Sequence, residues 1–115
     1  MNPLVLCELD EIIDGGAMEL LDHPYPVPEA LVIVRRGQKA WAYINRCPHF
    51  SVPLNYQPQI FCTYRSAILM CAHHSAMFRF EDGLCVDGPC KGARLQSVPV
   101  RVERDLVLLA GSDQV

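Results

Sequence analysis

The sequence has neither an excess of basic residues nor a long hydrophobic run. Its 115 residues include 10 Lys and Arg against 13 Asp and Glu, which gives a formal net charge of −3 and a pI of about 5.7. Proteins that bind nucleic acid concentrate positive charge, so we expect no nucleic-acid partner. No apolar stretch approaches the roughly 18 residues that a membrane-spanning helix requires, so we expect no membrane association.

The first residues also lack the features of a secretory signal. No basic residue precedes the short apolar run, and acidic residues interrupt the run from Glu8 onward. We therefore expect a cytoplasmic protein, in a compartment that keeps thiols reduced. The 6 cysteines are then interpreted as metal ligands or free thiols and not as a disulfide framework.

A convincing helical period is absent as well. Short runs rich in β-branched and aromatic residues alternate with clusters of Gly, Pro, Asn and Asp, which is typical of strands and turns. These runs predict strands over residues 3–9, 17–21, 30–34, 39–45, 60–64, 67–71, 77–80, 84–86, 98–103 and 106–110. The chain shows no repeat, low-complexity segment or linker, and half of its residues are hydrophobic. It is therefore predicted to form a single all-β domain over residues 1–115.

Two short stretches concentrate residue types that bind metals. They are Cys47-Pro48-His49 and Cys71-Ala72-His73-His74. A tight loop can aim such a Cys and His at one point, and the segment 50–70 is long enough for a hairpin that returns the second loop beside the first. Two such loops make a four-ligand cage, whose residue types suit iron or zinc.

The spacing of these residues resembles the Rieske [2Fe–2S] motif, in which Cys-x-His is followed by Cys-x-x-His. The similarity extends over about residues 3–109 and includes Leu54, Phe78, Gly83, Gly88-Pro89 and the closing strand 98–102. It implies an antiparallel β-sandwich or incomplete barrel as the base domain, about residues 3–45 and 91–110. A small cluster-binding subdomain, about residues 46–90, would be inserted into it.

By this resemblance the chain binds one [2Fe–2S] cluster. Cys47 and Cys71 would hold the inner iron as thiolates, and His49 and His74 would hold the outer iron through ring nitrogens. Neutral imidazole leaves less negative charge on its iron than thiolate does, which raises the reduction potential. Reduction makes the His ligands more basic, so we expect it to be coupled to proton uptake.

Two positions depart from the family pattern. Ser51 and Ser75 stand where Rieske proteins usually have Gly. If those backbones require a positive φ, Ser costs on the order of 1 kcal/mol at each position.

Further residues bear on the subfamily. Rieske proteins of cytochrome bc-type complexes carry a disulfide between the ligand loops, and the corresponding residues here are Val52 and His73. Their Ser and Tyr hydroxyls near the cluster are replaced by Ala76 and Phe78. Fewer hydrogen-bond donors stabilise the reduced cluster less, so we expect a potential at the low end of the Rieske range, about −150 mV.

The resemblance is therefore to free-standing Rieske ferredoxins. They are electron carriers that pass one electron from a flavin reductase to a terminal oxygenase or other oxidoreductase, and are not enzymes by themselves. No 2-His-1-carboxylate set remains for the mononuclear iron of an oxygenase. Two alternatives stay open, namely a tightly bound small Rieske subunit of a reductase complex and a zinc-stabilised binding module.

The roles of some neighbouring residues also stay open. His73 is either a competing ligand or a residue beside the ligands, and Cys90 either lies near the cluster or is a packed thiol like the remaining cysteines. Three residues of the first loop are candidates for a docking patch or for shielding the cluster. These are Phe50, Pro53 and Leu54.

Overall fold

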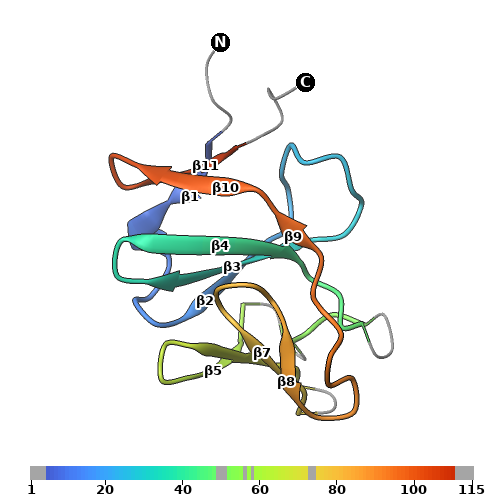
Figure 1. Ribbon diagram of the computed structural model, residues 1–115. Helices are drawn as coiled ribbons and strands as arrows, with labels where there is room; N and C mark the ends of the chain where they lie inside the picture. Colours follow the sequence, from blue (N-terminus) through green and yellow to red (C-terminus); the bar gives the residue numbers. More distant parts are fainter. Residues whose placement is uncertain (1–4, 49–51, 56, 58, 73–74, 111–115) are drawn as a thin grey trace.

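The computed structural model describes residues 5–48, 52–55, 57, 59–72 and 75–110. Nearly all of their regular structure is antiparallel β-sheet, as predicted, and the helical part of these residues is the short 3-10 turn η1 (Leu9–Glu11). Three sheets lie one above another (Figure 1). The described residues contain no helix long and apolar enough to cross a membrane.

We name the three sheets by their place in the chain. The terminal sheet has the order β1-β11-β10, with β1 (Val5–Glu8), β11 (Leu106–Leu109) and β10 (Val100–Glu103). The middle sheet has the order β2-β3-β4-β9, with β2 (Ala17–Leu20), β3 (Leu31–Arg36), β4 (Lys39–Ile44) and β9 (Ser97–Val98). The meander sheet runs β5-β6-β7-β8, with β5 (Cys62–Tyr64), β6 (Ile68–Met70), β7 (Met77–Arg79) and β8 (Cys85–Asp87).

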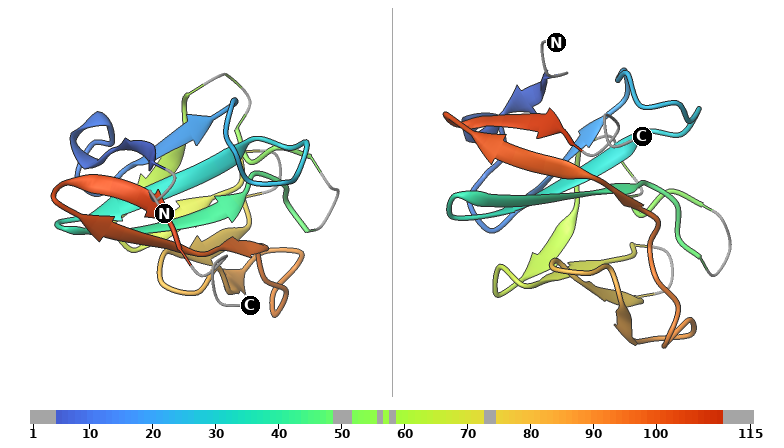
Figure 2. Two further views of the ribbon diagram at one scale, coloured as in Figure 1. Left: turned by 90° about the horizontal axis from the view of Figure 1, so that it is seen from above. Right: turned by 45° about the horizontal axis from the view of Figure 1, so that its top comes forward.

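Strand β3 lies between two cores. Successive side chains of a strand point to opposite faces, and all four residues from 31 to 34 are fully buried. Leu31 and Ile33 join the core shared with the terminal sheet, whereas Val32 and Val34 join the core shared with the meander sheet. The unbroken apolar run in the sequence therefore marks a strand that is covered on both faces (Figure 2).

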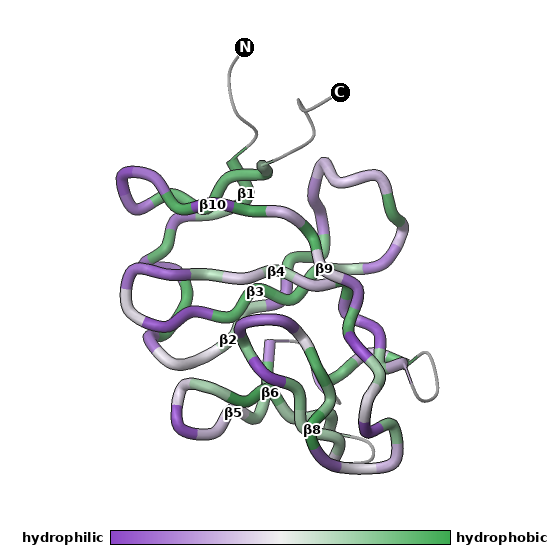
Figure 3. Tube along the Cα trace, viewed as in Figure 1, coloured by the Kyte–Doolittle hydropathy of each residue, from purple (hydrophilic) through white to green (hydrophobic). Residues whose placement is uncertain are grey.

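The hairpin tips are polar and tightly turned. Arg65 and Ser66 both have a positive φ, as do Arg104 and Asp105, with values from 53° to 63°. Two consecutive residues of this kind fit the twist of a two-residue hairpin. Both turns lie where the predicted strands leave a gap, at residues 65–66 and 104–105. In Figure 3 the polar tips of the β3–β4 hairpin, residues 35–39, and of the β10–β11 hairpin, residues 103–105, stand out.

Pro99 divides the strand that the sequence predicted over residues 98–103. β9 pairs with β4 of the middle sheet, whereas β10 pairs with β11 of the terminal sheet. Proline has no N–H to donate, but its carbonyl accepts a hydrogen bond from the N–H of Ala110 at 2.9 Å. The chain thus changes sheets at this residue and ties the two layers into an incomplete barrel.

The other predicted boundaries differ from the structure by one or two residues at most strands, as three examples show. Leu9 begins the 3-10 turn instead of ending a strand. Strand β5 begins at Cys62, so residues 60 and 61 precede it. β8 ends at Asp87, one residue beyond the predicted end, and Leu84 forms an isolated bridge with Arg94.

The meander sheet is fixed to the middle sheet by a buried hydrogen bond. The Tyr43 hydroxyl donates to the carbonyl oxygen of Phe80 at 2.5 Å. Gly83 packs against the same ring, since a Cβ at this residue would lie 2.8 Å from Cε1 of Tyr43. The aromatic side chains of Phe78 and Phe80 fill the space between the sheets and are fully buried. This packing holds the loops of the meander sheet against the end of β4.

Candidate metal centre

Cys47 follows β4 and opens the first ligand loop, residues 47–52. Its N–H donates to the carbonyl oxygen of Val52 at 2.7 Å, which closes the loop. The side chain of Cys47 is fully buried and belongs to the core between the middle and meander sheets.

Cys71 follows β6 and opens the second ligand loop, residues 71–76. Its N–H donates to the carbonyl oxygen of Ala76 at 2.8 Å, and its own carbonyl accepts the N–H of Ser75 at 2.9 Å. Cys71 is also fully buried and lies in the same core as the first cysteine. Each loop therefore begins with a buried cysteine at the end of a strand.

The two ligand loops lie side by side, as the sequence predicted. The N–H of Ala72 donates to the carbonyl oxygen of Leu54 at 2.8 Å and joins the second loop to the chain that leaves the first. The predicted ligands His49 and His74, and the neighbouring His73, lie outside the described residues. The two predicted thiol ligands are thus placed in adjacent loops.

A third loop, residues 87–92, covers the second ligand loop. Gly88 has a φ of +106°, and a Cβ at this residue would lie 2.7 Å from the Cα of Ala76. Only glycine allows this close approach of two backbones. The close contact with Ala76 therefore explains why the first residue of the Gly88-Pro89 pair is glycine.

Cys90 of the third loop lies beside the first ligand loop. Burial, together with interactions with Cys85 and Cys47, raises the pKa of its thiol to about 12. The Sγ atom of Cys90 donates a hydrogen bond to that of Cys85 at 3.4 Å. The sequence left the place of Cys90 open, and the structure packs it against the core that contains the predicted ligands Cys47 and Cys71.

A polar network that the sequence analysis missed supports the first ligand loop. Asn45 is buried, and its Oδ1 accepts the N–H of Leu54 at 2.8 Å. Its Nδ2 donates to Oδ1 of the buried Asn55 at 3.0 Å and to the Glu19 carboxylate at 3.2 Å. Asn55 donates to the other oxygen of Glu19 at 3.2 Å. The network fixes where the chain leaves the loop.

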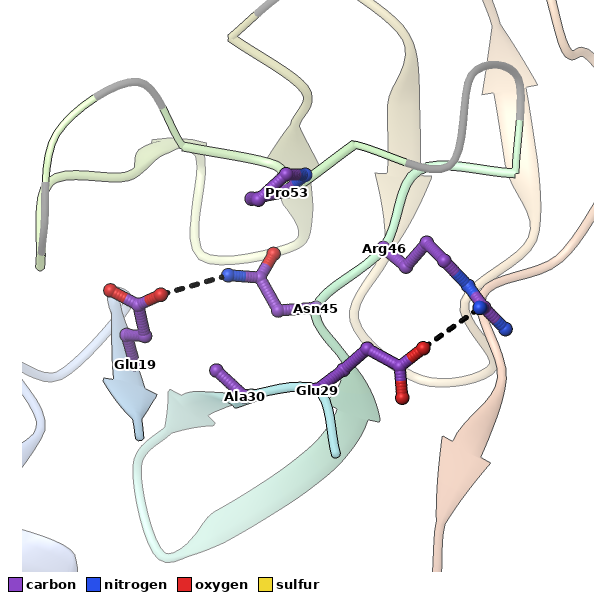
Figure 4. A pocket seen from close by; sticks show the side chains of 6 residues that line it. All are labelled: Glu19, Glu29, Ala30, Asn45, Arg46 and Pro53. Atoms are coloured by element: carbon purple, nitrogen blue, oxygen red, sulfur yellow. Dashed lines mark hydrogen bonds and ion pairs between the residues drawn. The ribbon is translucent and has the colours of Figure 1, made fainter. Parts of the chain in front are cut away.

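Figure 4 shows the hydrogen bond between Asn45 and Glu19 of this network, in a surface pocket that both residues line. Arg46 also lines the pocket, and it forms an ion pair with Glu29 at 2.8 Å between Nη1 and Oε2. In the sequence, Asn45 is the last residue of the strand predicted over residues 39–45, two residues before a predicted ligand. The structure ends β4 at Ile44, and a polar residue at the end of a strand did not by itself indicate a buried role.

The remaining predictions for the ligand loops have mixed outcomes. Ser75 has a φ of +59°, which confirms that Ser occupies a backbone conformation suited to Gly. Leu54 is fully buried, so its proposed part in a docking patch is wrong, because a residue without exposed surface cannot contact a partner. Pro53 is exposed and lines the pocket. Ser51 and Phe50 lie outside the described residues.

The buried cysteines fit an iron–sulfur group. Thiolate ligands to such a group sit in water-poor surroundings, and both Cys47 and Cys71 are withdrawn from solvent at the start of hydrogen-bonded loops. Within the described part of the chain, which leaves out residues 49 and 74, no group of three or more His, Cys, Asp or Glu side chains is arranged to hold a metal ion.

The sequence from residue 2 to residue 107 matches the family model of the Rieske [2Fe-2S] domain. The chain belongs to this family. The match covers the ligand loops and strands of all three sheets. It confirms the resemblance that was inferred from the motif spacing, over nearly the whole chain. No curated protein matches the sequence.

Solved structures share the fold of this Rieske chain. The ferredoxin of carbazole 1,9a-dioxygenase from Nocardioides aromaticivorans IC177 is 20% identical, with a TM-score of 0.76 over 97% of this chain and 100% of that one. The Sphingomonas yanoikuyae B1 ferredoxin is 20% identical, with a TM-score of 0.71 over 96% and 99% of the two chains. The terminal oxygenase of carbazole 1,9a-dioxygenase from Novosphingobium sp. KA1 is 25% identical, with a TM-score of 0.68 over 99% of this chain but 30% of the oxygenase.

Proposed function

We propose that this chain holds one Rieske-type [2Fe–2S] cluster between its two ligand loops. Cys47 and Cys71 are the thiolate ligands of the inner iron, and His49 and His74 are the imidazole ligands of the outer iron. The cluster supplies one-electron redox chemistry when bound. The observation that carries this proposal is the pair of buried cysteines at the start of adjacent loops, in a chain of the Rieske family.

The chain's own residues build the surroundings of the site. The fully buried side chains of Leu54, Ala76 and Phe78 share a core with Cys47 and Cys71 and keep water from the two thiols. Gly88 lets the third loop pack closely against Ala76 of the second ligand loop. This arrangement supports a cluster-binding subdomain at about residues 46–90 on a base domain at about residues 3–45 and 91–110. Ala76 and Phe78 offer no hydroxyl to the site, which supports a potential near the low end of the Rieske range, about −150 mV.

The function that follows is one-electron transfer in the cytoplasm, from a flavin reductase to a terminal oxygenase or other oxidoreductase. Structures with this fold include a ferredoxin in complex with the oxygenase of carbazole 1,9a-dioxygenase. The same fold also occurs within a longer oxygenase chain. The proposed carrier is not an enzyme by itself, and its partners are redox proteins.

Absorption and electron paramagnetic resonance spectra of protein purified without oxygen test the cofactor. We expect a visible charge-transfer spectrum and, after reduction with dithionite, a signal whose mean g value lies below that of the free electron. Iron and zinc are measured in the same sample. Colourless protein with stoichiometric zinc and no iron would support the zinc-stabilised module and overturn the proposal.

Variants then test the ligands. Cys47→Ser and Cys71→Ser should abolish the Rieske signal, whereas Cys62→Ser should preserve it because Cys62 is exposed on β5. A variant with both His49→Cys and His74→Cys should lose the pH dependence of the potential if it assembles a cluster. If the potential of this double variant still depends on pH, that result would argue against the His ligands.

Purification also distinguishes a carrier from a subunit. A carrier should elute alone and be reduced rapidly by a flavin reductase. A small Rieske subunit of a reductase complex would instead co-purify in stoichiometric amount with its larger partner.

A further inference from the structure

Two cysteine thiols outside the proposed ligand set are in contact. The Sγ atoms of Cys85, on β8, and Cys90, on the third loop, are 3.4 Å apart. The Cys85 thiol in turn donates to the carbonyl oxygen of Asp87 at 3.1 Å. A disulfide would require the two sulfur atoms to approach to about 2.05 Å.

The backbone holds the two cysteines in this arrangement. The carbonyl oxygen of Cys85 accepts the N–H of Gly92, and the N–H of Cys85 donates to the carbonyl oxygen of Ala93, at 2.9 Å and 2.8 Å. The carbonyl oxygen of Cys90 accepts the N–H of Ala93 at 2.9 Å. The third loop is therefore folded back onto Cys85, which gives the two thiols a high effective concentration for each other.

The two thiols differ in access. Cys85 is almost fully buried, at 1% exposure, whereas Cys90 is partly exposed. A small reagent in solution therefore reaches Cys90 first, and Cys85 is placed to react with the product. In its access to a reagent, though not in the pKa of Cys90, the pair resembles an attacking and a resolving thiol.

We propose that Cys85 and Cys90 are a redox-active dithiol, which a low-molecular-weight disulfide oxidises to an internal disulfide. The Cys90 thiolate attacks one sulfur of the reagent, forms a mixed disulfide and releases one thiol. The Cys85 thiolate then attacks Sγ of Cys90, forms the internal disulfide and releases the second thiol. Two electrons and two protons pass from the cysteine pair to the reagent, whose own disulfide bond is broken.

The position of the pair makes this oxidation relevant to the ligand loops. The third loop contacts Ala76 of the second ligand loop through Gly88, and Cys90 packs against the buried core that contains Cys47. Oxidation removes the S–H of both thiols and joins the third loop covalently to β8. The pair lies at other positions than the Val52 and His73 that correspond to the interloop disulfide of bc-type proteins. It also involves none of the proposed ligands, so it does not depend on which metal the protein binds.

A peptide map tests the proposal directly. Trypsin cleaves after Arg79 and Lys91, and the peptide 80–91 contains Cys85 and Cys90 but no other cysteine. The protein as purified is equilibrated without oxygen in mixtures of reduced and oxidised glutathione, quenched with acid, denatured, alkylated and digested. We expect peptide 80–91 to lose two hydrogen atoms and to take up no alkyl group. Equilibrium is measured instead of rate, because buried thiols react slowly.

The exposed Cys62 is an internal standard for the same samples. Cys62 can form only a mixed disulfide with glutathione or a link to a second molecule. We therefore expect the pair to oxidise at a fraction of glutathione disulfide at least ~10-fold lower than the fraction that modifies Cys62. The proposal would be overturned if both thiols of peptide 80–91 were still alkylated in samples in which Cys62 already carries glutathione. Glutathione that stays on Cys90, or a link from Cys90 to Cys47, would also overturn it.

Two variants separate the roles of the thiols. Cys85→Ser should leave glutathione trapped on Cys90, because the resolving thiol is missing. Cys62→Ser should leave oxidation of the pair unchanged. If Cys85→Ser does not fold, the map of the unaltered protein still decides the proposal.

Discussion

At the scale of single residues, Asn45 determines how the first ligand loop ends. Replacing it with Ala leaves the buried N–H of Leu54 without its acceptor and removes two donors from the network around Glu19. An unsatisfied buried group costs about 1–3 kcal/mol. We therefore expect Asn45→Ala to lower the free energy of unfolding by roughly 2 kcal/mol and to reduce the fraction of protein that retains metal.

Urea unfolding and metal analysis measure the two effects of this change. Gln57→Ala is the matched control, because the Gln57 side chain is exposed and its backbone carbonyl, which accepts from Asn55, is unchanged. An Asn45→Ala protein as stable and as fully loaded as the Gln57→Ala protein would contradict the role of the network.

Ser75 leads to a prediction of opposite sign. Its φ of +59° is unfavourable for a residue with a Cβ, so Ser75→Gly should raise the free energy of unfolding by about 0.5–1 kcal/mol. Ser97→Gly is the control, because Ser97 lies in β9, where glycine weakens a strand. Urea unfolding should therefore shift the two midpoints in opposite directions. A fall in both midpoints would show that the Ser75 hydroxyl contributes more than the backbone strain.

The residue scale also shows what the sequence could reveal about the site. Cys47 and Cys71 stood out because a thiol near a His at fixed spacing has few other uses; the structure places both in one core, and their role as ligands stays a prediction. Asn45 could not be predicted, because its acceptor role depends on the N–H of Leu54, nine residues later, and on a fold that buries both. The contact of Cys85 with Cys90 was equally hidden, because it depends on a loop that folds back on a strand.

At the scale of elements, the β7–β8 turn is held by a charged pair. Asp82 accepts hydrogen bonds from the Arg79 guanidinium and from the N–H of Leu84. These interactions, led by the bond from Arg79, lower the pKa of the Asp82 carboxyl to about 2 from its ordinary 3.8. Because the folded pKa is the lower one, the ionised carboxylate stabilises the turn above about pH 4, and the stabilisation is lost as the pH falls toward 2.

Asp82→Asn should isolate this charge, since the amide oxygen can still accept from Leu84. The pair is near the surface, so we expect a loss of about 0.5 kcal/mol at pH 7 and none near pH 2. Thermal unfolding at both pH values measures the difference. A double-mutant cycle with Arg79→Ala is the control, because Asp82→Asn should have little effect once Arg79 is gone. An equal loss at both pH values would contradict the charge argument.

Elements differed in how well the sequence predicted them. The β3–β4 hairpin was clear, because two apolar runs flank Gly37, whose φ is +62°. The strand predicted over residues 98–103 was wrong in one respect, since its alternation continues across Pro99 while the pairing changes sheets there. Alternation reports which face is buried, but the partner strand is decided by tertiary packing.

At the scale of the whole molecule, the chain is three layers with one shared sheet. β3 and β4 contribute to the core on each side, so the terminal sheet and the ligand loops pack against the same two strands. The ligand loops are therefore coupled to the terminal sheet through packed side chains. The family resemblance alone did not reveal that Val32, Val34 and Tyr43 of the middle sheet share a core with Cys47 and Cys71.

This arrangement predicts the order in which backbone amides exchange with solvent. β3 is paired on both edges and covered on both faces, so its amides should open only with global unfolding and exchange last. β5 is an edge strand of three residues with two exposed side chains, so its amides should exchange early. Hydrogen–deuterium exchange measured by mass spectrometry on the metal-loaded protein compares peptides that cover the two strands. Slower exchange in β5 than in β3 would mean that the meander sheet, and not the shared middle sheet, is the most stable part of the molecule.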